Sequence, residues 1–357
     1  FKDPAARHSF GPGGGALEHN TSSFYYLSES PNSLNKNNVV DISSHEFFHI
    51  VTPLNVASRE VKIFNWNEPV MSKHLWMYEG ITEYTSHHVL VRDGMNTVME
   101  FLGKMAGKIT TSQTYFNDTL PFVDLSKQSV GKHGNQFSNV YQKGALIGMA
   151  LDLELLKWSN GKYGVRELMK DLGKRFGKDK YFEDEQIFDI ITSMTFPGIR
   201  QFFQKYVEGN TPIPYVDYFA MAGVQLVPET SRKAVTSGGI SFVAGTGNKV
   251  MIGQNSKFDE LGILMGYQKG DEMIHFNGTD ITTANAGRVI NQVLSTIKEG
   301  DDFVVRVVRK NGDKTDTLTL QQKFIKGTVI DRNKVSLIPD SNEQQLKLRE
   351  AWLGRKE

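Results

Sequence analysis

Residues 43–52 read SSHEFFHIVT and contain the pattern His45-Glu46-Phe47-Phe48-His49. Residues four apart lie on one face of an α-helix, so the two histidines can offer ring nitrogens to one metal ion. Glu46 then lies beside the ion, where it can take a proton from a water molecule that the metal activates. The alternative is an ordinary core helix with one buried and one exposed histidine, because this spacing also arises by chance.

The composition is that of an ordinary globular protein. The chain has 357 residues, of which 39% are apolar and 23% charged, and this length predicts two or three domains. The formal net charge is +1, so we expect no nucleic-acid partner and no attraction to an anionic membrane. The absence of cysteine excludes disulfides, thiolate catalysis and cysteine-bound zinc. No apolar run approaches about 18 residues, so we expect no transmembrane segment.

A catalytic zinc ion needs a third protein ligand and an open fourth position. The strongest candidate is Glu79 in LWMYEGITEY, within a segment that has the pattern of a second long helix. Glu83 lies four residues further on the same face, where its carboxylate can accept a hydrogen bond from the free ring N–H of a ligand histidine. The alternative is that Glu79 and Glu83 form a solvated acidic face.

The pattern of the chain changes near residue 225. Before it helical patterns dominate, with a first helix predicted from Val40 to about Val56 and an edge strand, ALEHNTSSFYYL, ahead of it. From about 226 to 322 short β-rich runs alternate with turns such as Asn311-Gly312, and one helix, ANAGRVINQVLSTI, lies among them. We therefore predict an α+β protein with domains at 1–225 and 226–325, and a tail at 326–357 that forms a short surface helix.

Four motifs resemble one enzyme family. HEFFH followed by LWMYEGITEY is similar to the gluzincin metallopeptidases, in which a Trp-x-x-Glu-Gly segment completes the metal site. GGGALEHN at 13–20 resembles the Gly-rich exopeptidase strand of aminopeptidases, and NVYQKGALIG at 139–148 resembles a helix whose tyrosine faces the zinc. Together with the C-terminal part, the motifs resemble the glycyl-aminopeptidase family of zinc metallopeptidases with a PDZ domain. The fold that this resemblance implies is a thermolysin-like, mainly helical zinc peptidase domain followed by a small β-rich PDZ-like domain.

The resemblance implies a catalytic centre with one zinc ion. His45, His49 and Glu79 would hold the ion. Glu46 would be the general base and later the acid that protonates the leaving amine. Tyr141 would donate a hydrogen bond to the oxyanion that forms during hydrolysis.

The resemblance also implies residues that bind a peptide substrate. Glu18 would bind the free α-amino group, and the strand with Gly14, Gly15 and Ala16 would pair with the peptide backbone. Glu83 would orient a ligand histidine. Four other histidines are expected to be structural or exposed: His8, His19, His87 and His88.

GILMGYQKGDEMIHFNGTDI is similar to the core of a PDZ domain. Gly270-Asp271 would start a strand, and Asn277-Gly278 would make the turn after it. The helix from about 284 to 298 would form one wall of a groove, and GISFV the facing strand edge, where a peptide ligand could add as a further strand. The alternative is a small β-rich domain that only caps or spaces.

We predict a zinc-dependent peptidase, and among peptidases an aminopeptidase. The alternatives are a non-catalytic peptide-binding scaffold on a peptidase fold and a zinc endopeptidase. IVTPLNVAS, after the second histidine, differs from the usual residues of the family, so the residue preference is left open. The chain opens FKDPAARHSFGPGGG, and we expect an upstream β domain and any targeting signal to lie outside it. The sequence leaves the compartment open, and the periplasm or cell envelope of a bacterium is the one it favours.

Overall fold

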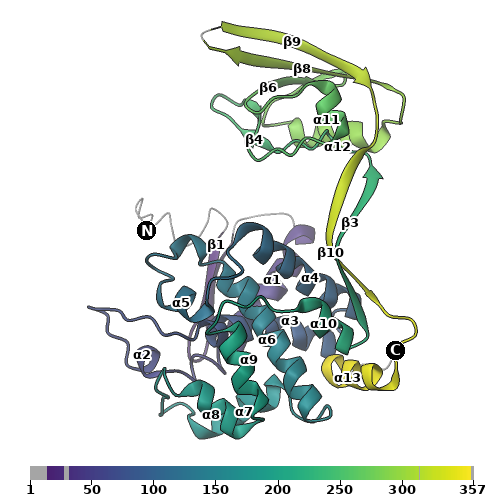
Figure 1. Ribbon diagram of the computed structural model, residues 1–357. Helices are drawn as coiled ribbons and strands as arrows, with labels where there is room; N and C mark the ends of the chain where they lie inside the picture. Colours follow the sequence, from purple (N-terminus) through teal and green to yellow (C-terminus); the bar gives the residue numbers. More distant parts are fainter. Residues whose placement is uncertain (1–13, 28–31, 313, 355–357) are drawn as a thin grey trace. The chain divides into compact units, whose positions relative to one another are not determined.

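The computed structural model describes residues 14–27, 32–312 and 314–354 (Figure 1). Contacts divide the chain into two compact units: unit 1 comprises residues 1–228 and 333–357, and unit 2 comprises residues 229–332. Helices prevail among the described residues of unit 1 and strands among those of unit 2, so the predicted α+β class is confirmed. The division into domains at 1–225, 226–325 and 326–357 stays a prediction.

Helix α6 (Asn139–Trp158) lies at the centre of unit 1. Most of its residues are buried, because the run GALIGMALDLELL places apolar side chains on every face of the helix. Around it pack the π-helical turn η1 (Trp76–Ile81) and helices α3 (Thr82–Arg92), α4 (Val98–Tyr115), α5 (Phe122–Lys127), α7 (Val165–Arg175), α9 (Gly198–Tyr206) and α10 (Tyr215–Met221). Two further helices of unit 1 are α2 (Arg59–Lys62) and α8 (Ile187–Met194).

The crossing of η1 and α6 is a direct contact between backbones. A Cβ atom on Gly80 of η1 would lie 2.6 Å from backbone atoms of Gly144 on α6, and one on Gly144 would lie 2.8 Å from the Cα atom of Gly80. Two side chains of any larger size would force the elements apart. The contact therefore fixes Glu79, which precedes Gly80, against the helix that carries Tyr141.

Helix α1 (Asn32–Phe48) starts and ends earlier than the predicted helix from Val40 to about Val56. The residues after it form turns, because Pro53 lacks an N–H group and its ring disfavours helical dihedral angles at Thr52. His49 consequently lies in the first turn after the helix rather than within it.

The segment ALEHNTSSFYYL forms two strands rather than the single edge strand that was expected. Strands β1 (Gly14–Glu18) and β2 (Ser23–Leu27) pair in an antiparallel hairpin in which Glu18 lies opposite Ser23. The polar residues between them make the reversal, closed by a bond from the His19 N–H to the Ser22 carbonyl at 2.8 Å. In the described part of the chain the second edge of β1 has no partner strand.

Unit 2 contains one antiparallel sheet with the strand order β4-β5-β6-β8-β9, and β7 pairs with β6. The hairpin between β8 and β9 closes with Asn311 opposite Lys314, next to the predicted Asn-Gly turn. Asn277 and Gly278 make the turn between β6 and β7, with φ angles of 40° and 98°. The elements are β4 (Phe242–Ala244), β5 (Val250–Ile252), α11 (Glu260–Met265), β6 (Glu272–Phe276), β7 (Thr279–Asp280), α12 (Ala286–Thr296), β8 (Asp302–Asn311) and β9 (Lys314–Lys323).

The C-terminal segment returns to unit 1. Strands β3 (Val224–Ala234) and β10 (Gly327–Leu337) pair, and helix α13 (Glu343–Leu353) follows. The helix has one exposed face and one buried face: Trp352 is fully buried, and its Nε1–H donates to the Tyr84 hydroxyl at 2.8 Å. Among the described residues, none of the helices combines the length and apolar character that a membrane crossing requires.

Candidate metal centre

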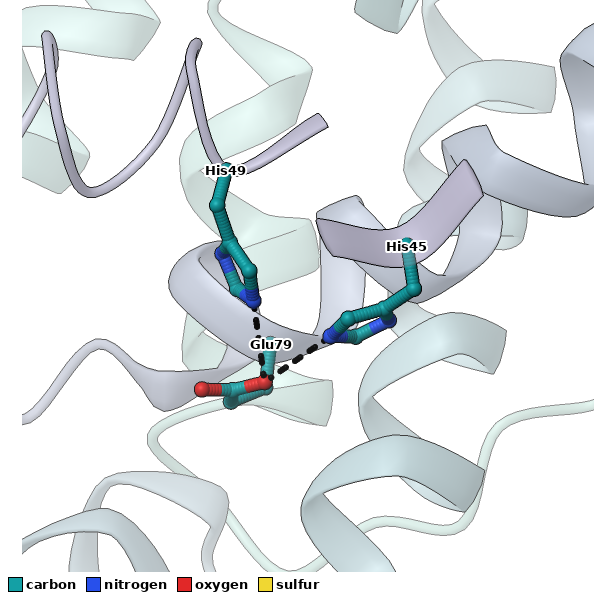
Figure 2. A group of neighbouring side chains, drawn as sticks. All are labelled: His45, His49 and Glu79. Atoms are coloured by element: carbon teal, nitrogen blue, oxygen red, sulfur yellow. Dashed lines mark ion pairs between the residues drawn. The ribbon is translucent and has the colours of Figure 1, made fainter. Parts of the chain in front are cut away.

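Three side chains from two segments converge on one point (Figure 2). His45 lies in the last turn of α1, His49 in the turn after that helix, and Glu79 in η1. The Nε2 atoms of His45 and His49 lie 3.3 and 3.8 Å from the same oxygen, Oε2 of Glu79. Both histidines are buried, whereas the Glu79 side chain is 22% exposed, so the cluster is reached from solvent on the carboxylate side.

The second nitrogen of each ring fixes which atom faces the cluster. Nδ1 of His45 lies 2.7 Å from a carboxylate oxygen of Glu83, and Nδ1 of His49 lies 3.0 Å from the carbonyl oxygen of Thr52. Because these oxygens can only accept, each Nδ1 donates its hydrogen, and in a neutral ring Nε2 then presents a lone pair. When both rings are neutral, two lone pairs and a carboxylate oxygen therefore face one another, and a proton or a metal ion between them relieves their repulsion.

The donor set and its spacing fit zinc. Two imidazole nitrogens and one carboxylate oxygen are the ligands of many catalytic zinc sites, with bonds of about 2 Å. Tetrahedral ligands at that bond length lie about 3.3 Å from one another, close to the 3.3 and 3.8 Å measured here. His45, His49 and Glu79 are therefore placed where they could hold one zinc ion.

The charges around the cluster favour a cation. Burial lowers the pKa of His45, but hydrogen bonds to Glu79 and Glu83 outweigh this effect and raise the pKa to about 10. Burial raises the pKa of Glu79, but the hydrogen bond from His45 and the charge of His49 bring it below its ordinary value. In the protein alone a proton at His45 satisfies this negative environment, and a metal ion would take the place of that proton.

Glu46 and Glu18 lie beside the ligands. Ligand atoms of Glu18, Glu46 and His49 all lie within 4.8 Å of one another, although Glu18 comes from strand β1. Oε2 of Glu46 is buried and has no hydrogen-bond partner among the described residues. Burial raises the pKa of Glu46 above its ordinary value, against the opposing charges of His45 and His49. A carboxylate with a raised pKa is a better proton acceptor near neutral pH.

Tyr141 of α6 flanks the cluster. Its ring centre lies 5.7 Å from that of His45. Burial raises the pKa of Tyr141, and the charge of Glu79 raises it further. The hydroxyl therefore keeps its hydrogen near neutral pH and can donate it to an oxygen in the site.

The four residues predicted to bind substrate all lie on strand β1, whose last residue is close to the cluster. Glu18, at the end of the strand, reaches the metal centre. Gly14, Gly15 and Ala16 lie earlier on the same strand, which packs against α1.

Several residues of the site are absent from the sequence-based prediction. Thr52 holds His49 through its carbonyl, and His87 and Lys108 hold Glu83 through hydrogen bonds to its Oε1 atom at 3.1 and 2.5 Å. His87 lies four residues after Glu83 on α3, a spacing that would have signalled the contact. Lys108 comes from α4, and nothing in the local sequence indicates its position.

Comparison with known proteins relates part of the chain to a family of peptidases. Residues 38–147 match the model of the M61 glycyl aminopeptidase family. The match agrees with the resemblance that the motifs predicted, and the matched segment contains His45, His49, Glu79 and Tyr141. Glu18 and the rest of β1 lie outside the matched segment.

A solved structure shares the fold over nearly the whole chain. The crystal structure of an aminopeptidase N family protein from Idiomarina loihiensis aligns with a TM-score of 0.62 and 20% sequence identity. The alignment covers 95% of this chain but only 60% of that one, so the chain spans less than two thirds of that protein. At this identity the likeness shows the fold alone. No curated protein matches the chain.

Proposed function

We propose that the chain is a zinc-dependent aminopeptidase with a thermolysin-like catalytic unit. The observation that carries the proposal is the convergence of three possible ligand atoms, from His45, His49 and Glu79, on one point. The carboxylates of Glu46 and Glu18 beside them supply the remaining groups that such a reaction requires. When bound, zinc supplies a Lewis acid that acidifies water and polarises the scissile carbonyl.

Two side chains, Glu46 and Tyr141, handle the protons of the proposed reaction. Glu46 takes a proton from the attacking water through its unpartnered oxygen and later gives it to the leaving amine. Tyr141 donates its hydroxyl hydrogen to the carbonyl oxygen, which becomes negative in the transition state. Because this hydrogen bond strengthens as charge develops, it lowers the barrier rather than only tightening substrate binding.

Glu18 gives the reaction its preference for a free N-terminus. Its carboxylate lies within reach of Glu46 and His49 and can pair with the α-ammonium group of a bound peptide. The edge of β1 that lacks a partner strand in the described residues lets the peptide backbone pair alongside. An endopeptidase would have no ammonium group to place at this carboxylate.

Unit 2 is proposed to be PDZ-like, with a groove that binds a peptide ligand. Support comes from the order of its elements, in which a strand, the Asn277-Gly278 turn and helix α12 follow one another as the motif requires. Strand β4 lies at one end of the sheet, so one of its edges is free within the described residues. The periplasmic or envelope location and the lack of a nucleic-acid partner stay predictions.

Glu46→Gln tests the proposal. The variant keeps the size of the side chain and removes the proton acceptor, so zinc content should stay at one ion per chain while hydrolysis of aminoacyl substrates falls by about 100-fold or more. Zinc content is measured on purified protein by elemental analysis, and hydrolysis with a panel of aminoacyl amides. Full activity in the variant would remove Glu46 from the mechanism.

The same panel separates the alternatives. Wild-type protein that holds zinc and cleaves free but not N-acetylated peptides is an aminopeptidase. Cleavage of N-acetylated peptides at equal rates indicates an endopeptidase. Protein without zinc and without hydrolysis, but with peptide affinity, is a scaffold.

A further inference from the structure

Lys108 lies behind the metal centre and takes no part in the mechanism above. We propose that Lys108 is a positioning residue of the metal site: it fixes the carboxylate of Glu83, and Glu83 orients His45 toward the metal. The inference rests on the proposed zinc function and deepens it.

The carboxylate of Glu83 lies between His45 and Lys108, and each of its two oxygens bonds one of them. Oε2 accepts from Nδ1 of His45 at 2.7 Å, while Oε1 accepts from Nζ of Lys108 at 2.5 Å. Lys108 therefore sets the rotation of the carboxylate plane, and that plane sets the direction of the ring hydrogen of His45. Groups that hold the outer nitrogen of a ligand histidine fix the orientation and basicity of its ring.

Lys108 is buried, so its ion pair with Glu83 differs from the exposed ion pairs that are common on protein surfaces. Only 8% of the residue is exposed, although lysines usually keep their ammonium group in water. A buried ammonium is costly unless it is paired, and removing it would leave the buried carboxylate of Glu83 without its cation. His87 also donates to Glu83, at 3.1 Å, so Lys108 and His87 share the Oε1 atom.

Lys104 offers a matched comparison on the same helix. It lies one turn before Lys108 on α4, and its Nζ contacts both oxygens of Asp41 on α1, at 2.6 and 2.5 Å. Its side chain is 31% exposed, against 10% for Lys108. Both lysines thus tie α4 to a carboxylate of a neighbouring helix, but of the two it is Lys108 that contacts Glu83, the residue that holds His45.

The test measures zinc affinity by competition with a chromogenic chelator for the wild type, K108M, K104M, E83Q and the double variant E83Q/K108M. Methionine keeps the unbranched stem of lysine and its packing, without the charge. K108M is expected to bind zinc about 10- to 100-fold more weakly, which is the usual effect of removing a group behind a ligand histidine. K104M is expected to bind within about twofold of the wild type.

The double variant separates positioning from packing. If Lys108 acts through Glu83, adding K108M to E83Q costs little further affinity, because the effect is already lost. Urea unfolding of the metal-free proteins measures the structural part, which a packing role would change without changing the zinc affinity of the folded protein. Should K108M fail to fold, K108Q replaces it, since its amide is polar but shorter than the lysine side chain and uncharged; the expected loss is then at least about threefold.

Results for the Lys108 variants test this inference, whereas zinc binding by the wild-type protein tests the proposed function. Zinc affinity of folded K108M or K108Q equal to that of the wild type overturns the inference. The inference is also overturned if K108M causes the same loss of affinity in the wild-type protein and in the E83Q variant. A wild-type protein that binds no zinc overturns the proposed function and, with it, this inference.

Discussion

Gly80→Ala tests whether the crossing of η1 and α6 sets the geometry of the metal centre. The added Cβ would lie 2.6 Å from the backbone of Gly144, whereas ordinary contact begins near 3.4 Å, so the elements must separate by about 0.8 Å. The added Cβ is fixed by the backbone of residue 80 and meets backbone atoms of Gly144, so no side-chain rotation relieves the clash. Inserting a methyl group into such a contact costs about 1–3 kcal/mol.

The displacement also reaches the adjacent residue, Glu79. Metal–ligand distances must hold within about 0.2 Å, so a shift of about 0.8 Å should weaken zinc binding by about tenfold or more. Chelator competition measures the affinity, and urea denaturation measures the free energy of unfolding of the metal-free protein.

Gly103→Ala is the matched control. Gly103 lies in the exposed face of α4 with no atom within 4 Å of its added Cβ. Alanine in a helix interior is more stable than glycine by about 0.5–1 kcal/mol, so this variant should gain stability and keep its zinc affinity. Gly80→Ala protein with the stability and zinc affinity of the wild type would refute the argument that the two glycines fix the site.

Three further predictions concern other parts of the chain. Trp352→Ala should lower the free energy of unfolding by about 3–5 kcal/mol, because it empties a fully buried site, and urea denaturation measures this loss. Glu18→Gln should raise KM for peptides with a free N-terminus by about tenfold and leave any cleavage of N-acetylated peptides unchanged; equal effects on both would contradict the proposed ammonium site. Hydrogen bonds from Lys233 and Thr328 lower the pKa of Glu260 from 4.5 to about 2. Its carboxylate thus stabilises unit 2 above about pH 4.5, and this contribution is lost as the pH falls through about 2. Glu260→Gln should therefore lower the melting temperature of unit 2 at pH 7 but not below pH 2, and scanning calorimetry at both values would show whether the difference exists.

The residues that converge at the metal centre could be found from the sequence because their chemistry limits them to few positions. His45 and His49 belong to a pattern whose spacing alone brings both rings to one side, and the acidic residue that completes it, Glu79, lies in a recognisable motif. The pattern survives although α1 ends at Phe48, because the turn that follows still directs His49 toward Glu79. The proposed roles of these residues await the experiments above.

What the sequence could not reveal depends on contacts between distant segments. Lys108 and Lys104 look alike in the sequence, and only the packing of α4 against α3 decides that one of them is buried beside Glu83. The C-terminal segment SNEQQLKLREAWLGRKE is mostly polar, so its composition favoured a surface position. Its Trp352 is nevertheless enclosed, because the chain returns to a core built by residues more than two hundred positions earlier.

This return affects how the protein can fold while it is being synthesised. Residues 229–332 are contiguous, so unit 2 can complete its sheet as soon as they have left the ribosome. Unit 1 must wait for α13, the last helix described, before Tyr84 meets its partner and the space that Trp352 fills is closed. We expect nascent chains that stall before α13 to expose an incomplete helical core, which makes them targets for chaperones and proteases.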